Sequence, residues 1–145
     1  MISPQRTEVT RIVMGSGEKD EPLLSGRIVY IVDDDPSVRN ALTRYLAVMG
    51  MDVMGFDSAE EFLAQLAGLP AGLLIVDMQL PGICGLQLIR EMARAGIHWP
   101  TVVISGSHEG HEDEVALEVG PDRYLRKPFD AEALLRALHF AGIEE

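Results

Sequence analysis

The sequence predicts an α/β fold: a doubly wound, five-stranded parallel sheet in the flavodoxin-like order 2-1-3-4-5, with helices on both faces. Short apolar runs alternate with longer segments in which apolar residues recur every three or four positions. The run at 73–76 is apolar at every position, which is typical of a central strand covered by helices on both sides. Because short loops join these segments, consecutive strands are expected to connect through helices and to run parallel.

Five strands and five helices are expected to alternate from residue 27 onwards. The strands are predicted at 28–32, 51–56, 73–76, 100–104 and 123–126, and the helices at 36–49, 58–66, 86–95, 109–119 and 130–140. Asp35 is a good N-cap ahead of Pro36, and Ser58 with Glu61 has the spacing of a capping box. The last helix begins at the N-cap Asp130 and carries a set of apolar residues on its core face: Leu134, Leu135, Leu138 and Phe140.

Length and composition indicate one globular domain at 27–145, preceded by a flexible extension at 1–26 that shows no sustained periodicity. The formal net charge of −11 disfavours direct nucleic-acid binding, because neutralising phosphates requires clustered Lys and Arg. No apolar run is long enough to cross a membrane, and no secretion signal opens the chain. The single cysteine, Cys84, excludes an internal disulfide, so the cytoplasm is the expected compartment.

Polar side chains stand at the carboxyl ends of four predicted strands: Asp33, Asp34 and Asp35, then Asp77, then Ser105, then Lys127. Parallel strands bring these ends to one edge of the sheet, where ligands bind in folds of this class. Each residue alone has an ordinary explanation, since an Asp after a strand often caps a helix and a lone Lys is often a surface charge. Their joint placement favours one shared site.

The carboxylates of this group predict a divalent cation. Crowded carboxylates repel one another, so they either hold a proton or recruit a positive ion. Oxygen ligands with room for water favour Mg²⁺, which Asp34 and Asp77 would hold. Lys127 and Ser105 would then contact the oxygens of an incoming phosphoryl group, and Asp77 would be the nucleophile that forms an acyl phosphate.

The motifs at these strand ends resemble the signature of response-regulator receiver domains from two-component signalling. The motifs are Asp33-Asp34, Asp77 with Leu80-Pro81-Gly82, Ser105-Gly106 and Lys127-Pro128-Phe129, and the resemblance covers about residues 27–141. Their spacing is similar to that of the nitrogen-fixation regulator subfamily. The resemblance implies a signalling domain rather than an enzyme, with only self-directed phosphoryl acceptance and slow autodephosphorylation. Because the sequence ends at Glu145, soon after the last predicted helix, a stand-alone receiver is expected.

The resemblance also implies a role for each matching residue at the site. Asp77 would be the phospho-acceptor, and Lys127 the ammonium group that senses the phosphate. Mg²⁺ would be bound by Asp34 directly, by Asp33 through water, by Asp77, and by the backbone carbonyl of Gln79.

The switch that the resemblance implies involves Ser105 as the switch hydroxyl and Tyr124 as the switch aromatic, which turns inward from solvent after phosphorylation. A cis bond between Lys127 and Pro128 is also implied. The small Gly106 would leave the acceptor open to a phosphodonor or water. Gln79 and Ser107 would flank the path of attacking water and so set the lifetime of the phosphoryl group.

The partners implied are a sensor histidine kinase or phosphotransfer protein as the donor, and a downstream protein whose identity is unknown. The face from the fourth to the fifth helix is the expected docking surface, and it would also serve a homodimer. Neither a nucleic acid nor a membrane is expected as a direct partner.

Three alternatives place different chemistry on the same residues. A haloacid-dehalogenase-like phosphatase would use Asp33 as nucleophile and Asp35 as general acid, but it leaves Asp77 unexplained, and the chain ends too soon after Lys127 for that family's acidic metal pair. An unphosphorylated, receiver-like interaction module would usually lack an acidic residue or the Lys. A flavodoxin would need a Ser/Thr/Gly-rich phosphate loop after the first strand, where the three Asp residues stand.

Overall fold

The computed structural model describes residues 25–106, 120 and 123–143. A five-stranded parallel sheet forms its centre, in the order β2-β1-β3-β4-β5. The strands are β1 (Ile28–Val32), β2 (Asp52–Phe56), β3 (Leu73–Asp77), β4 (Thr101–Ser105) and β5 (Tyr124–Arg126). The helices are α2 (Pro36–Val48), α3 (Ala59–Gln65), α4 (Gly85–Arg94) and α6 (Ala131–Ile143), with a short 3₁₀ turn, η2 (Leu66–Gly68), after α3. The predicted fold class and strand order are confirmed.

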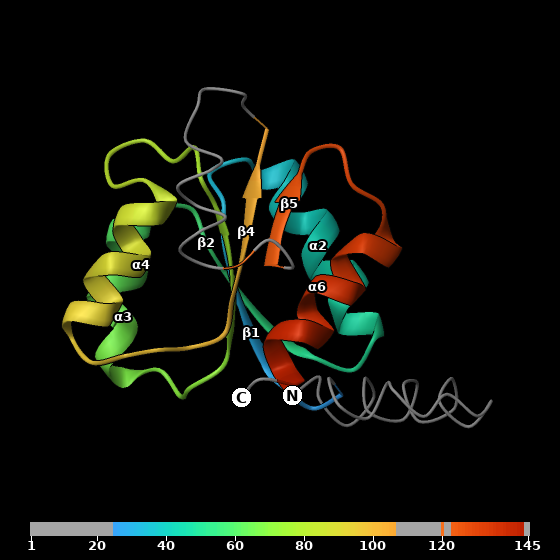
Figure 1. Cartoon of the computed structure of the whole chain (residues 1–145), viewed down its shortest axis with the longest axis horizontal. Helices are drawn as coiled ribbons and strands as arrows, with labels where there is room; N and C mark the ends of the chain where they lie inside the picture. Colours follow the sequence, from blue (N-terminus) through green and yellow to red (C-terminus); the bar gives the residue numbers. More distant parts are fainter. Residues whose placement is uncertain (1–24, 107–119, 121–122, 144–145) are drawn as a thin grey trace.

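Two layers of helices cover the sheet. Figure 1 shows α3 and α4 on one face and α2 and α6 on the other. Leu74 and Val76 of β3 pack in the cluster beneath α3 and α4, whereas Leu73 and Ile75 pack in the cluster beneath α2 and α6. Because successive side chains of a strand point to opposite faces, a run that is apolar at every position needs a helical cover on both sides.

These two hydrophobic clusters form the core and are named here by the helices that cover them. The α3–α4 cluster contains Tyr30, Val32, Phe56, Ala59, Phe62, Leu66, Leu74, Val76, Met78, Leu80, Leu86, Leu88, Met92 and Val103. The α2–α6 cluster contains Val29, Ile31, Leu42, Leu46, Met51, Leu73, Ile75, Val102, Ile104, Leu134, Ala137, Leu138 and Ala141. The central sheet separates the two clusters.

Side-chain caps fix where three helices begin, as the sequence predicts. The carboxylate of Asp35 accepts a hydrogen bond from the backbone N–H of Ser37 at 2.9 Å, and Pro36 is the first residue of α2. Ser58 and Asp130 accept in the same way from N–H groups of α3 and α6, at 3.1 and 2.8 Å. Such a cap contributes about 1 kcal/mol to helix stability.

The structure corrects several details of the prediction. β2 begins one residue later than expected, and α4 begins one residue earlier. Phe140 was expected on the core face of α6 but is 45% exposed, because Ala137 and Ala141 occupy that face with Leu134 and Leu138 at helical spacing. The extension at 1–26, except for its last residues, and the helix predicted at 109–119 lie outside the described residues.

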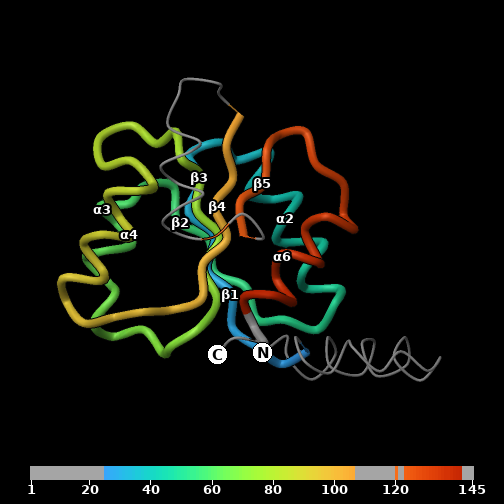
Figure 2. The backbone as a smooth tube through the Cα atoms, viewed as in Figure 1, coloured from blue at the N-terminus to red at the C-terminus, as the bar shows by residue number. Residues whose placement is uncertain are grey.

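All five strands point in the same direction, so their carboxyl ends lie at one edge of the sheet. In Figure 2 the ends of β3, β4 and β5 lie side by side at the upper edge, between the two helical layers. The polar residues that follow the strands are therefore gathered at this edge.

Candidate functional site

A group of carboxylates occupies the carboxyl edge of the two central strands. Asp33, Asp34 and Asp77 each offer an oxygen, and these oxygens all lie within 4.8 Å of one another. The pairing of Val32 with Val76 explains why they lie close together, because Asp33 directly follows Val32 at the end of β1 and Asp77 directly follows Val76 as the last residue of β3. Asp33 and Asp77 are buried, whereas Asp34 is exposed.

The buried carboxylate of Asp33 has one satisfied oxygen. Its Oδ1 accepts a hydrogen bond from the backbone N–H of Asp35 at 2.9 Å. Its Oδ2 is buried without a hydrogen-bond partner among the described residues, and the nearest cation is Lys127, whose Nζ lies 3.8 Å away. Burial raises the pKa of Asp33, and the charges of Asp77 and Asp34 act in the same direction against the Asp35 N–H and Lys127.

Asp77 is held at both of its carboxylate oxygens. Its Oδ1 accepts a hydrogen bond from the backbone N–H of Gln79 at 3.0 Å, and its Oδ2 accepts one from Lys127 Nζ at 3.3 Å. The loop after β5 delivers Lys127, whose backbone N–H donates to the carbonyl of Ser105 at 2.7 Å. The Lys127–Pro128 bond is cis, as the resemblance implied.

Ser105 ends β4 beside the carboxylate of Asp77. Asp77 pairs with Ile104 across the sheet, which places Ser105 one residue beyond that pair, and its side chain is buried. Gly106 follows, and a Cβ at this position would lie 3.4 Å from Cδ of Lys127. A larger residue there would therefore pack directly on the lysine that contacts Asp77.

Tyr124 lies on β5 opposite Val103 and packs against the α3–α4 cluster. Its hydroxyl oxygen is buried and has no hydrogen-bond partner among the described residues. The sequence predicts that this ring turns inward from solvent after phosphorylation, and in this structure the ring is half-buried.

The residues at this edge fit a magnesium ion. The orphaned Oδ2 of Asp33 is a buried acceptor, and three carboxylates within 4.8 Å of one another repel each other unless a cation lies among them. Their hard oxygen donors, one of them solvent-exposed, suit a cation that keeps several of its waters. The ligands would be Asp33, Asp34 and Asp77, as the sequence predicts.

Asp35 lies outside this carboxylate group. Its carboxylate caps α2 by accepting from Ser37, and it is not among the three residues whose oxygens converge. The phosphatase alternative needs Asp35 as a general acid next to Asp33, so this geometry disfavours it.

Sequence reasoning missed two side chains that bind the backbone around the site. Arg39 donates from Nη1 to the carbonyl of Asp33 at 2.6 Å, and Glu60 accepts from the backbone N–H of Ile83 at 3.0 Å. The only signal in the sequence is a charged residue near the start of a helix, which is typical of a solvated surface position. Packing of distant segments decides both contacts.

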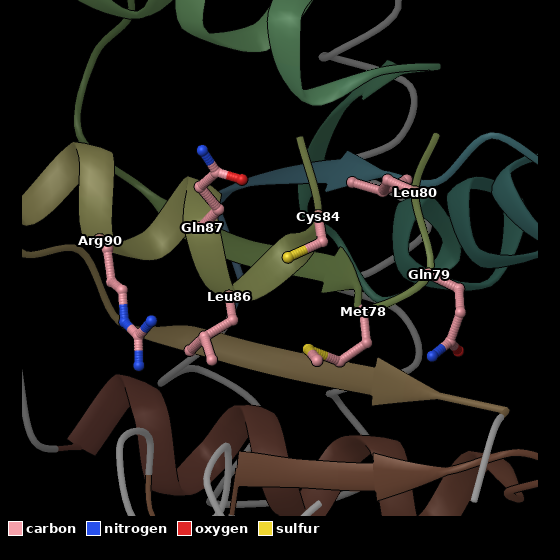
Figure 3. A pocket seen from close by; sticks show the side chains of 7 residues that line it. All are labelled: Met78, Gln79, Leu80, Cys84, Leu86, Gln87 and Arg90. Atoms are coloured by element: carbon pink, nitrogen blue, oxygen red, sulfur yellow. The ribbon is translucent and has the colours of Figure 1, made fainter. Parts of the chain in front are cut away.

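A pocket of about 550 Å³ lies beside the loop that follows Asp77. Its lining includes Leu86 and Arg90 of α4 and Met78, which directly follows β3 (Figure 3). Gln79 reaches the pocket and Cys84 is partly buried within its lining, but the carboxylates of Asp33 and Asp77 are not part of it.

Among the described residues, no helix is long and apolar enough to cross a membrane.

The chain is similar in sequence to curated regulators. It is 36% identical over 111 residues to Nodulation protein W of Bradyrhizobium diazoefficiens, and the alignment covers 77% of this chain and 49% of that protein. It is 34% identical over 110 residues to the transcriptional regulatory protein FixJ of Azorhizobium caulinodans, covering 76% of this chain and 52% of the relative. The chain thus spans about half the length of these curated relatives.

The solved structures that match include a crystal structure of FixJ-N, with a TM-score of 0.75 and 30% sequence identity, covering 84% of this chain and 98% of that one. The family model described as response regulator receiver domain matches residues 29–139, a span that contains all three clustered carboxylates and, apart from Ile28 at the start of β1, the five described strands. The chain therefore belongs to the receiver domains of two-component response regulators.

Proposed function

We propose that Asp77 accepts a phosphoryl group, in the presence of Mg²⁺, from a phosphohistidine of a sensor histidine kinase or phosphotransfer protein. One observation carries the proposal: the Asp77 carboxylate lies 3.3 Å from the ammonium of Lys127 and shares its surroundings with the carboxylates of Asp33 and Asp34. A nucleophilic carboxylate, a cation and a metal-binding pair are the parts that phosphoryl transfer requires.

The transfer is a displacement at phosphorus. An oxygen of Asp77 forms the new P–O bond while the P–N bond of the donor breaks, and the electron pair of that bond stays with the imidazole nitrogen. Lys127 and the Ser105 hydroxyl bind oxygens of the transferred group. Bound by Asp33, Asp34, Asp77 and the Gln79 carbonyl, Mg²⁺ would supply positive charge against the phosphoryl oxygens.

The switch follows from the charge that the product carries. A phosphoryl group adds about −1.5 to −2 charges and strong acceptor oxygens. Ser105 is drawn towards this group, and Tyr124, on the neighbouring strand, shifts further into the space beside it. A partner that binds the phosphorylated conformation better than the unphosphorylated one then responds to the phosphorylation of Asp77.

The unit proposed to signal in this way is residues 27–145. Its output is a protein contact made in the cytoplasm through the face between the predicted fourth helix and α6, to a downstream protein or to a second copy. The phosphoryl lifetime depends on Gln79 and Ser107, of which Ser107 lies outside the described residues.

Phosphodonor labelling tests the proposal directly. The protein is incubated with acetyl phosphate and Mg²⁺, and its intact mass is measured. We expect a gain of one phosphoryl group that is absent in Asp77→Asn and after chelation of Mg²⁺. Asp35→Asn is the matched control, because its carboxylate caps α2 instead of joining the carboxylate group, and it is expected to label normally.

The competing phosphatase chemistry predicts the opposite pattern. Labelling that persists in Asp77→Asn but disappears in Asp33→Asn would assign the nucleophile to Asp33 and contradict the proposal. Absence of any mass gain in the wild-type protein, with donor and Mg²⁺ in excess, would favour an unphosphorylated interaction module.

A further inference from the structure

The guanidinium group of Arg39 binds the backbone of the carboxylate group. Nη1 of Arg39 donates a hydrogen bond to the carbonyl oxygen of Asp33 at 2.6 Å. Asp33 is the residue at which the chain leaves β1, and its N–H still bonds the carbonyl of Phe56 at 3.1 Å. A backbone carbonyl at a buried strand end needs a hydrogen-bond partner, and a side chain from α2 supplies one here.

This contact fixes a segment that carries two proposed metal ligands. Asp33 is held through its N–H by β2, through its carbonyl by Arg39, and through its carboxylate by the N–H of Asp35. The peptide unit that accepts from Arg39 joins Asp33 to Asp34. Rotation of this unit would move both carboxylates, so the guanidinium limits their freedom.

Gly55 of β2 provides the passage through which Arg39 reaches this carbonyl. A Cβ at position 55 would lie 3.0 Å from Cδ and 3.1 Å from Cγ of the arginine, so any larger residue would push the side chain away. Gly in a strand weakens it, and its presence often marks a close approach of another group. The absence of a side chain at Gly55 thus allows the Arg39 side chain to lie where it can bind the carbonyl of Asp33.

Arg39 contacts the backbone of Asp33 and not its carboxylate. The guanidinium donates to the carbonyl oxygen of Asp33, whereas the carboxylate oxygens of this residue lie by the N–H of Asp35 and the ammonium of Lys127. The contribution of Arg39 is therefore to the position of the peptide that carries the carboxylates.

We infer that Arg39 is a positioning residue for magnesium binding: it holds the Asp33–Asp34 peptide in the orientation that presents both carboxylates, and Gly55 makes room for it. The inference rests on the magnesium site of the proposed function. Loss of the guanidinium is expected to weaken Mg²⁺ binding and to leave the transfer step at saturating Mg²⁺ unchanged.

Direct titration with Mg²⁺ by calorimetry measures the first effect. Arg39→Met is expected to raise the dissociation constant about three- to tenfold, the size of one lost hydrogen bond to an ordered group. Arg39→Lys keeps a donor on a shorter, single-point head group and is expected to recover part of this loss. Arg44→Met is the control, because Arg44 is an exposed arginine on the same helix.

Gly55 allows the same inference to be tested without touching the arginine. Gly55→Ala is expected to weaken Mg²⁺ binding in the same direction as Arg39→Met, and the double variant should be no weaker than Arg39→Met alone. Gly68→Ala is the matched control, since a Cβ there meets no heavy atom within 4 Å.

A labelling assay separates positioning from a merely structural role. The Mg²⁺ concentration for half-maximal labelling by acetyl phosphate should rise in Arg39→Met, while the labelling rate at saturating Mg²⁺ stays within about twofold. A lower melting temperature with an unchanged dissociation constant in both Arg39→Met and Gly55→Ala would overturn the inference. If the wild-type protein is never labelled but Arg39→Met still weakens Mg²⁺ binding, the proposed function fails and the positioning role stands.

Discussion

Asp33 is the residue at which burial and charge conflict most strongly. It is 1% exposed, lies within reach of two other carboxylates, and has one oxygen without a hydrogen-bond partner among the described residues. A buried carboxylate in this position destabilises a fold unless a cation compensates it. The carboxylate group is therefore better explained as a metal site than as a stabilising feature.

Removal of this charge should stabilise the metal-free protein. The pKa of Asp33 is raised in the folded state, so the folded protein holds a proton that the unfolded chain has already lost. Unfolding free energy consequently falls as the pH rises from the ordinary value of 3.8 through the raised pKa, and stays low above it. Asp33→Asn should abolish this fall and melt at a higher temperature than the wild-type protein at pH 7 in EDTA.

Addition of Mg²⁺ should reverse that order. If Mg²⁺ binds the folded protein as proposed, it should raise the melting temperature of the wild-type protein, whereas Asp33→Asn lacks one of the three carboxylates and should respond weakly. Thermal melts with increasing Mg²⁺ measure both effects. An equal rise in the two proteins would contradict a role for Asp33 in metal binding.

Tyr30 offers a second test at the residue scale, away from the metal site. Its hydroxyl donates to the carbonyl of Pro70 at 2.5 Å, and burial raises its pKa above the ordinary value of 10.0. The neutral form is thus favoured by folding, and stability should fall as the pH rises above about 10. Tyr30→Phe should lose about 1 kcal/mol at pH 7 and show a shallower alkaline fall in urea titrations. An identical alkaline slope would contradict the assignment.

At the scale of elements, the start of α4 lies very close to the backbone at the end of β3. A Cβ at Gly85 would lie 2.6 Å from the carbonyl oxygen of Asp77 and 3.1 Å from the Cα of Met78. The glycine thus allows α4 to begin against the end of β3, and the loop between them stays short. The first residue of α4 thus packs against the backbone of Asp77.

Gly85→Ala should therefore destabilise the domain. An alanine normally favours a helix over glycine by about 0.5–1 kcal/mol, but here the added methyl group collides with backbone atoms that cannot move cheaply. We expect a net loss of about 1–3 kcal/mol in urea denaturation, together with slower labelling of Asp77. Gly68→Ala, which meets no atom within 4 Å, should show no such loss.

At the scale of the whole molecule, the described residues form two hydrophobic clusters on opposite faces of one sheet. Leu88 belongs to the α3–α4 cluster and Ile31 to the α2–α6 cluster, and both side chains are fully buried. No residue belongs to both clusters, so a defect on one face has no shared cavity with a defect on the other.

Mutations on the two faces should therefore be additive. Leu88→Ala is expected to cost about 2–5 kcal/mol and Ile31→Val about 0.5–1.5 kcal/mol. The double variant should equal the sum within about 0.5 kcal/mol in urea denaturation. A larger deviation would show that the sheet transmits strain between the clusters.

The sequence determined the fold class, the strand order and the edge at which the site forms. The reason is physical: a strand apolar at every position, as in β3, must be covered twice, and parallel strands must end at the same edge. Side-chain caps such as Asp35 are local contacts, so the sequence also placed the starts of three helices. The carboxylates and Lys127 could be grouped because each stands at the carboxyl end of a strand or within two residues after it.

Only the tertiary structure decided which distant side chains meet. The bond from Arg39 to Asp33 and the bond from Ile83 to Glu60 depend on how α2 and α3 lie against the sheet, which periodicity does not reveal. The exposure of Phe140 was also decided by the tertiary structure, because Ala137 and Ala141, not Phe140, lie on the buried face of α6. The spacing of apolar residues along the sequence indicates which side chains of a helix or strand are buried. Contacts between elements depend instead on the angles at which the elements pack and on the space left by small residues such as Gly55.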